Sequence, residues 1–332
     1  MIGHAAARMR SQHGLITFAQ AVDSGLRPAQ INALLKQGRW VRVRPGVYAE
    51  ADLWASLDPW IGQPALRARA THMVVRIQHW LSHDSAIALH GLSLIARKHE
   101  RVHLTRPDRR GRQVREGLTQ HGAKVHETEM ADLDGLPVLS LARTALDVVR
   151  EHGFAVGLGA CDQALRAGVT RDELEHAAAM MWGWPFSVSV REAVLLADAQ
   201  AENPFESAAR ALVLELGIGI PETQFGLSDG NRSVYCDMRV GRHVFEADGK
   251  VKLTPVALGG YAPDPTRALW EEKKRQDLVT GFKLGMSRIT YADLFSQRDV
   301  AKRRLTREYD DTVARFGTSI ADLAPYILRR AA

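Results

Sequence analysis

Residues 237–252 carry acidic side chains at a spacing that suits a metal-dependent phosphodiesterase. We predict two strands there, joined by a tight turn at Gly241 and Arg242. Pairing across that turn would bring Asp237 within reach of Glu246. Two carboxylates that converge on a hard divalent cation, with a lysine alongside, can support cleavage of a phosphodiester bond. This segment is therefore our first candidate for a functional site.

The second of these strands would place its charged residues on one face, because successive side chains of a strand point to opposite sides of a sheet. Phe245, Ala247 and Val251 would take the buried side. The residues expected on the charged face are Glu246, Asp248, Lys250 and Lys252.

The order of residues from about 202 to 293 resembles the PD-(D/E)XK nucleases, which share a restriction-endonuclease-like fold, and in particular the domains related to very-short-patch repair endonucleases. A helix carrying Glu206 comes first, and a strand carrying Gln224 follows it. Asp237 and Glu246 match the family's two metal carboxylates. The resemblance implies a DNA endonuclease in which Asp237 and Glu246 hold Mg²⁺ or Mn²⁺. Glu206 would assist directly or through water, and Gln224 would orient the water or the scissile phosphate.

One position departs from the family pattern. Asp248 stands two residues after Glu246, where a lysine normally holds the attacking water. Lys250 or Lys252 would lie on the same face and would have to take that role. We therefore leave open whether the domain cleaves DNA. Acidic residues near a hairpin are also common on ordinary protein surfaces.

Residues 14–36 predict a helix-turn-helix. Thr17 can cap the first helix, Gly25 can end it, and Pro28 suits the first turn of the second helix. Apolar residues recur at helical spacing on the second helix, so its polar side chains would face outward and could bond base edges or phosphates in a major groove. These outward residues are Arg27, Gln30, Asn32 and Lys36.

Residues 38–48 alternate cationic and apolar side chains, as a small hairpin would. Trp40 would pack on the helices, while a row of arginines would face outward as a wing along the phosphates. The segment resembles the winged helix of AbiEi-type antitoxins, which implies DNA as a partner and a cognate toxin as another. Small winged helices also serve as protein-interaction modules, and that alternative stays open. The arginines of the row are Arg39, Arg42 and Arg44.

Residues 82–92 also resemble AbiEi-type proteins, and the resemblance implies a mixed α/β domain after them. His83 and His90 are seven residues apart, with Asp84 as the one carboxylate between them. We assign both histidines to capping and packing rather than to a metal. The regular elements expected around this segment are a helix over 64–81, strands at 102–105, 124–126 and 136–139, and a helix capped by Ser140.

The chain of 332 residues has a formal net charge of +6, with 45% hydrophobic and 25% charged residues. These values suit a globular protein, and the positive charge favours a polyanion such as DNA as partner. No apolar run approaches the roughly 20 residues that cross a bilayer, and the N-terminus lacks the apolar core of a signal peptide, so we expect a cytoplasmic protein. With only Cys161 and Cys236, a disulfide framework is excluded.

These observations predict an α/β (α+β) protein with a winged helix at 1–60, a mixed α/β region at 61–150, a helical connector at 151–200, a nuclease-like domain with a central mixed sheet flanked by helices at 201–300, and a helical tail at 301–332. The predicted function is that of a DNA-binding protein and candidate Mg²⁺-dependent endonuclease in defence or repair. The alternative is an antitoxin and autorepressor whose nuclease-like domain is non-catalytic. If both DNA strands are cut, a homodimer or two sequential nicks would be required.

Overall fold

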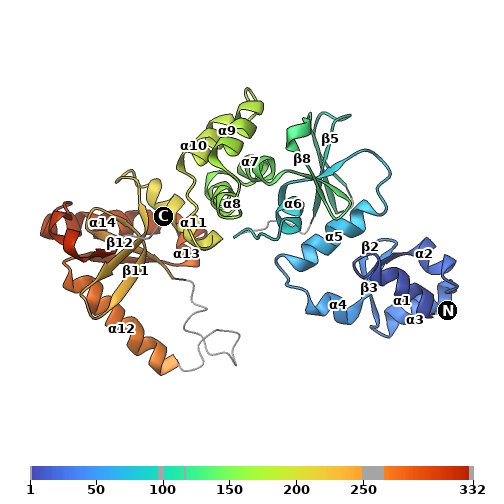
Figure 1. The fold of residues 1–332 in the computed structure, drawn as a ribbon, viewed down its shortest axis with the longest axis horizontal. Helices are drawn as coiled ribbons and strands as arrows, with labels where there is room; N and C mark the ends of the chain where they lie inside the picture. The colour runs from blue at the N-terminus through green and yellow to red at the C-terminus, as the bar shows by residue number, and fades with distance from the viewer. Residues whose placement is uncertain (1, 96–100, 116, 249–264, 329–332) are drawn as a thin grey trace. The chain divides into compact units, whose positions relative to one another are not determined.

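The structure, a computed structural model, describes residues 2–95, 101–115, 117–248 and 265–328 (Figure 1). It has the mixed α/β architecture that the sequence predicts, with three separate sheets. None of the helices in these ranges has the length and apolarity that a bilayer span requires. The chain forms two compact units, Met1–Gly153 with Gly168–Leu195, and Phe154–Ala167 with Leu196–Ala332.

The first unit begins with the predicted winged helix. Thr17 accepts the backbone N–H of Gln20 and the Gln20 side chain accepts that of Thr17, so a capping box starts the second helix, and Pro28 begins the third. A core that includes Ile31 and Trp40 lies between the helices and one face of the sheet, whose antiparallel strand order is β1-β3-β2. The elements are α1 (Ile2–Arg10), β1 (Leu15–Thr17), α2 (Phe18–Asp23), α3 (Pro28–Lys36), β2 (Trp40–Arg44) and β3 (Val47–Glu50).

Two further helices, α4 (Ala51–Ser56) and α5 (Gly62–His72), cover the other face of this sheet. Leu15, Val47 and Ala49 alternate with the residues of the first core and pack against Leu66 and Ala70 of α5. The small sheet is therefore buried on both sides.

A six-stranded sheet follows, in the order β6-β7-β5-β4-β9-β8. The β5–β7 and β4–β9 pairs are parallel, and the remaining pairs are antiparallel. Leu81, Leu104 and Val138 of this sheet share a core with Ala68 of α5 and Ala86 of α6. The elements are β4 (Trp80–Leu81), α6 (His83–Leu89), β5 (Val102–Arg106), β6 (Gly111–Arg115), β7 (Leu118–Gly122), η1 (Glu127–Glu129), β8 (Met130–Leu133) and β9 (Leu136–Leu139).

The helix predicted after Ser140 is α7 (Leu141–His152), and the Ser140 hydroxyl accepts the backbone N–H of Arg143. The Arg143 guanidinium is buried between the carboxylates of Glu129, at 2.6 Å, and Asp147, at 3.0 Å. The first unit closes with α9 (Arg171–Met180), which starts with a capping box at Thr170, and with α10 (Ser187–Leu196).

The second unit contains a mixed five-stranded sheet in the order β13-β12-β11-β10-β14. Strands β12 and β13 are parallel and the other pairs are antiparallel. Residues 202–293 form, in chain order, a helix, three antiparallel strands, a second long helix and a strand parallel to β12. The elements are α8 (Phe154–Arg166), α11 (Pro204–Leu214), β10 (Glu222–Ser228), β11 (Ser233–Val240), β12 (His243–Ala247), α12 (Pro265–Gly281), β13 (Gly285–Ile289), α13 (Tyr291–Leu294), α14 (Arg298–Phe316), η4 (Ala321–Tyr326) and β14 (Ile327–Leu328).

Two local predictions are wrong. The helix expected over 64–81 ends at His72, because Trp80 and Leu81 pair with Thr105 and Leu104 in the large sheet instead. The strand expected at 124–126 is irregular and leads into η1. In the first case, tertiary pairing outweighs local helix propensity. The residues of the predicted connector are divided, since α8 belongs to the second unit and α9 to the first.

Candidate functional site

Helix α3 separates a buried face from a polar one. Ile31 and Leu34 are buried in the winged-helix core. Gln30 Oε1 accepts the backbone N–H of Arg27 at 2.8 Å, which helps to cap the helix and leaves the Gln30 NH₂ group as a donor for a base edge. The polar side chains predicted to contact DNA are all exposed, and they are Arg27, Gln30, Asn32 and Lys36.

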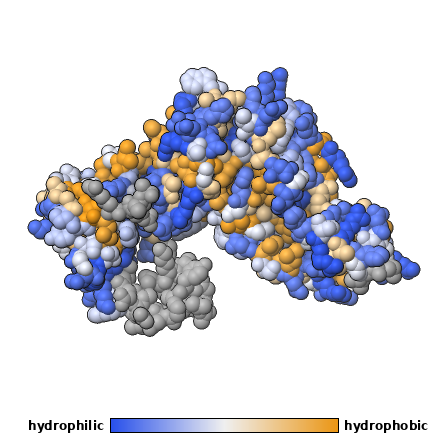
Figure 2. Space-filling view, viewed as in Figure 1, coloured by the Kyte–Doolittle hydropathy of each residue, from blue (hydrophilic) through white to orange (hydrophobic). Residues whose placement is uncertain are grey.

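Arg39 and Arg42 extend this polar surface beyond the helix. Arg39 follows α3 and Arg42 lies on β2, and both side chains are exposed. On the face shown in Figure 2, hydrophilic residues predominate over these N-terminal elements. Cationic side chains on a helix and on the hairpin beside it suit contacts with the sugar-phosphate backbone.

The wing departs from strict alternation at Arg44. A β-bulge between Arg42 and Arg44 places Arg42 opposite Tyr48 but Arg44 opposite Val47. Tyr48 and Val47 belong to the two opposite cores, so the bulge turns Arg44 towards α5. There its guanidinium donates to the Thr71 hydroxyl at 2.9 Å, and the residue is only partly exposed. Arg44 therefore leaves the row of arginines that the alternation predicts.

The hairpin predicted around Asp237 and Glu246 forms in the second unit. Strands β11 and β12 pair antiparallel, with Met238 opposite Phe245. Asp237 Oδ2 accepts the backbone N–H of Ala247 at 2.7 Å, which brings this carboxylate beside the Glu246 segment. All five residues of β12 are buried. The strand is therefore covered on both faces, rather than on the one face that the sequence predicts.

The carboxylate of Glu246 is held by Arg275, which comes from α12. The two guanidinium nitrogens of Arg275 lie 3.0 Å from the two Glu246 oxygens, an arrangement that gives two parallel charge-assisted hydrogen bonds. Burial, and then the nearby charge of Glu246, raises the pKa of the Cys236 thiol, so this residue stays protonated. The sequence assigned no site role to Arg275, because its contact with Glu246 depends on how α12 packs against the sheet.

Glu206 lies at the start of α11 and is also bonded to protein groups. Its carboxylate accepts the backbone N–H of Glu202 at 2.8 Å and the side-chain amide of Asn203 at 2.6 Å. Gln224 Nε2 donates to it at 3.4 Å, so the two residues that the sequence assigned to one site do meet. Gln224 has a φ of 51°, a left-handed conformation that a glutamine adopts only where its surroundings impose it.

The three carboxylates predicted to bind a metal are not gathered as closely as a cluster of histidines elsewhere in the chain. In the described ranges, the one group of three or more histidine, cysteine or acidic residues with ligand atoms within 4.8 Å of one another is a histidine group. The metal site at Glu206, Asp237 and Glu246 stays a prediction.

Asp248, another catalytic candidate, directly follows the end of β12. The backbone N–H of Asp248 donates to the carbonyl of Ile289 at 2.8 Å, and its carboxylate lies 3.6 Å from Arg288 Nη1. Lys250 and Lys252 fall outside the described residues, so their predicted role stays untested.

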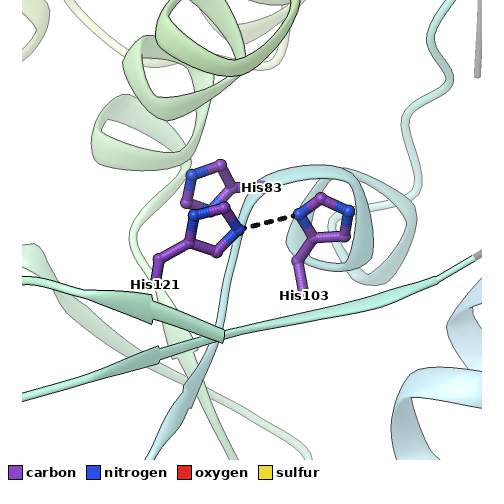
Figure 3. Close-up of side chains that lie close together, drawn as sticks. All are labelled: His83, His103 and His121. Carbon is purple, nitrogen blue, oxygen red and sulfur yellow. Dashed lines mark hydrogen bonds between the residues drawn. The ribbon is translucent and has the colours of Figure 1, made fainter. Parts of the chain in front are cut away.

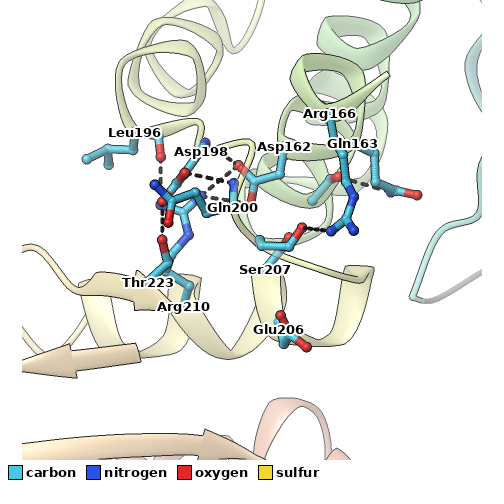
Figure 4. Close-up of polar contacts among 12 residues, drawn as sticks. Asp162, Gln163, Arg166, Leu196, Asp198, Gln200, Glu206, Ser207, Arg210 and Thr223 are labelled. Atoms are coloured by element: carbon cyan, nitrogen blue, oxygen red, sulfur yellow. Dashed lines mark hydrogen bonds and ion pairs between the residues drawn. The ribbon is translucent and has the colours of Figure 1, made fainter. Parts of the chain in front are cut away.

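A buried ion pair fixes α11 and with it Glu206 (Figure 4). Arg210 Nη2 donates to both carboxylate oxygens of Asp162 on α8, at 2.7 and 2.8 Å. Burial raises the pKa of Asp162, and the positive charge of Arg210 opposes that effect. Asp162 also accepts the backbone N–H of Asp198, whose carboxylate accepts the hydroxyl of Thr223 on β10. The network thus ties α11 to both α8 and the sheet.

Comparison with protein families gives two matches. A family model described as a transcriptional regulator, AbiEi antitoxin, matches residues 7–51, which span the winged helix from α1 to the start of α4. A model described as the AbiEi antitoxin C-terminal domain matches residues 80–197, which span the six-stranded sheet and the helices α6 to α10.

Two curated relatives come from Mycobacterium tuberculosis, the uncharacterized proteins MT2308 (strain CDC 1551) and Rv2248 (strain H37Rv). Each is 30% identical over 205 residues, which cover 59% of this chain and 68% of the relative. A crystal structure of the RV2827C protein from Mycobacterium tuberculosis matches with a TM-score of 0.37 and 16% identity. That match covers 64% of this chain and 80% of the solved one.

Proposed function

The chain belongs to the same family as the mycobacterial protein Rv2248 and carries two AbiEi antitoxin domains, and from this premise we propose that it is a DNA-binding transcriptional regulator of the AbiEi antitoxin type. The observation that carries the proposal is the surface formed by α3 and its N-cap residue Arg27, where four polar side chains are exposed over a buried apolar face. A helix of this kind in a helix-turn-helix enters the major groove, and the wing beside it contacts the phosphates.

We expect different residues of this surface to read the bases and to contact the phosphates. Gln30 and Asn32 carry side-chain amides, which can bond an adenine edge, whereas Lys36 and Arg42 carry charges that attract phosphates of any sequence. We propose that the first pair sets specificity and that the second pair sets affinity. The DNA segment upstream of the protein's own gene is the target to test, because an antitoxin of this type would repress its own promoter.

The test is a binding titration of the full chain with that segment and with a shuffled sequence, at several salt concentrations. Gln30→Ala with Asn32→Ala should bring the two affinities together, while Lys36→Ala should weaken both and reduce the salt slope by about 1. Arg303→Ala, which removes an exposed charge from α14 in the second unit, is the matched control and should bind as wild type. Absence of DNA binding at low salt would reject the proposal and favour a protein-interaction module.

A cognate toxin is the second partner that we propose for an antitoxin of this family. The gene next to this one is the place to look for it. Expression of that neighbour alone should arrest growth, and co-expression of this chain should restore it. Growth arrest that persists in the presence of this chain would contradict the assignment. Palindromic half-sites in the bound DNA would indicate a homodimer.

A metal-dependent nuclease is a second candidate function, favoured by one observation. Asp237 and Glu246 come from paired strands, and Gln224 bonds to Glu206 in the same unit. Because Arg275 holds Glu246, metal binding there would require that ion pair to open.

The nuclease candidate is tested by nicking of supercoiled plasmid with Mg²⁺ or Mn²⁺. Glu246→Gln should abolish metal-dependent nicking, and Asp310→Asn, at an exposed acid on α14, should leave it unchanged. Equal background cleavage by the wild type and by Glu246→Gln would show that this unit does not cleave DNA.

A further inference from the structure

Three histidines from separate elements of the first unit meet inside it (Figure 3). His83 begins α6, His103 lies on β5 and His121 lies on β7. Each offers a ring nitrogen, and these nitrogens lie within 4.8 Å of one another. His103 Nδ1 and His121 Nε2 are 3.0 Å apart. With metal–nitrogen bonds of about 2.0–2.1 Å, the ligand nitrogens of a tetrahedral zinc ion lie about 3.4 Å apart, so the spacing nearly suits one ion.

A hydrogen bond from Ser82 orients the His83 ring, and α6 loses its usual N-terminal cap in exchange. Ser82 occupies the N-cap position of α6, where a serine hydroxyl normally accepts a backbone N–H, but it makes no such bond. Its hydroxyl lies 3.0 Å from His83 Nδ1 instead, which leaves Nε2 as the ligand atom. His83 also has a φ of 49°, a strained conformation for a residue other than glycine. A hydrogen bond to the second ring nitrogen is a common companion of a metal-bound histidine.

The three rings are held in a neutral state. His83 and His103 are buried and His121 is partly buried. Burial is the main cause that lowers the pKa of all three. A neutral imidazole is the form that binds a metal.

One side of the cluster faces an open space. His103 lines a cavity of about 450 Å³, together with Thr119, Asp84, Arg112 and Glu151. Thr119 lies next to His103 in the parallel β5–β7 register. The Thr119 hydroxyl is fully buried and has no hydrogen-bond partner in the described part of the chain. An unpartnered buried hydroxyl beside the histidines fits a site built for a water or an ion that completes the polar contacts.

We propose that His83, His103 and His121 bind one divalent transition-metal ion of the zinc class, with water from the cavity as the fourth ligand. Three imidazoles and one open position form a ligand set that zinc takes in proteins. The rings of His83 and His121 are stacked, with centroids 3.7 Å apart and planes 13° from parallel. A metal ion lies in the plane of each ligand ring, so binding turns one ring out of this stack about its second side-chain torsion, which is soft in histidine.

The test uses the full chain without a histidine tag, stripped with a chelator and titrated with Zn²⁺ in competition with a zinc indicator. The wild type should bind one equivalent, and Co²⁺ should give the strong visible absorption of four-coordinate cobalt. His103→Gln and His121→Gln should each weaken binding at least about 100-fold, and Ser82→Ala about 10-fold. His176→Gln, at an exposed histidine of α9, is the matched control and should bind as wild type.

Each outcome decides the proposal. Failure of the wild type to bind Zn²⁺, or wild-type affinity in folded His103→Gln and His121→Gln, would overturn it and leave the cluster as a polar core. If a ligand variant does not fold, Ser82→Ala decides, because it keeps all three imidazoles: an unchanged affinity there would equally overturn the assignment.

Discussion

Arg143 is the largest fully buried side chain in the described part of the protein, and its charge is neutralised by two buried acids. Burial acts to lower the pKa of Arg143, but the negative charges of Asp147 and Glu129 together outweigh it and raise this pKa. Arg143→Met would leave Glu129 and Asp147 buried without this cation. We expect the free energy of unfolding of the first unit to fall by about 3–5 kcal/mol, measured by urea titration.

The matched control for Arg143 is an exposed arginine in a loose ion pair. Arg232 lies 3.6 Å from Asp229 with 56% of its side chain exposed. Arg232→Ala should leave the free energy of unfolding of the second unit, to which Arg232 belongs, nearly unchanged. Equal losses for the two variants would show that burial of the Arg143 network adds nothing to stability.

His243 should make the second unit sensitive to acid. Its ring is buried between the hydroxyls of Thr312, at 2.7 Å, and Ser287, at 2.8 Å. Burial lowers the pKa of His243 from 6.5 to about 4, and the negative charge of Glu308 opposes this. Between these two pH values the unfolded chain binds a proton that the folded chain does not. The stability contribution is therefore complete above pH 6.5 and is lost as the pH falls towards 4, by up to about 3 kcal/mol.

Urea unfolding at pH 7 and pH 4.5 measures this effect. His243→Gln keeps a polar side chain but cannot take up the proton, so its stability should change less between the two pH values than that of the wild type. The same change in both proteins would assign the acid sensitivity to other groups.

At the scale of the element, the β-bulge in β2 gives different positions to Arg42 and Arg44, which the sequence predicted to face the phosphates together. Arg42 is exposed on the wing, whereas Arg44 is turned to Thr71. Arg42→Ala should weaken DNA binding at every sequence and lower the slope of log affinity against log salt by about 1. Arg44→Ala should leave that slope unchanged. Titrations at several salt concentrations measure both slopes. A slope that falls equally in Arg42→Ala and Arg44→Ala would show that Arg44 also contacts phosphate.

The sequence predicted correctly those helix starts that depend on residues close to one another in the chain. The caps at Thr17 and Ser140 are confirmed because their hydrogen bonds span only a few residues, and Pro28 begins α3 as predicted. The bulge beyond Arg42 could not be predicted in this way. It depends on packing against α5, which is remote in sequence.

At the scale of the whole molecule, the sequence predicted an order of elements and the contact of Gln224 with Glu206, but it missed other contacts between distant residues. The predicted connector is divided between two compact units, because α8 packs with α11 through the Asp162–Arg210 pair. Arg275 reaches Glu246 from another element, and His83 meets His103 because the start of α6 lies against β5. Each of these contacts joins segments that are distant in sequence, so residue spacing within one element could not indicate them.

The central claim is that the exposed face of α3 reads a DNA sequence. Competition binding of the full chain, between its own upstream DNA and a shuffled segment of the same composition, measures this claim most directly. For the wild type we predict a preference of at least about 1,000-fold at physiological salt, which falls to within about tenfold of unity in the Gln30→Ala, Asn32→Ala variant. A wild-type ratio near one, or a ratio that the double variant leaves unchanged, would contradict the account.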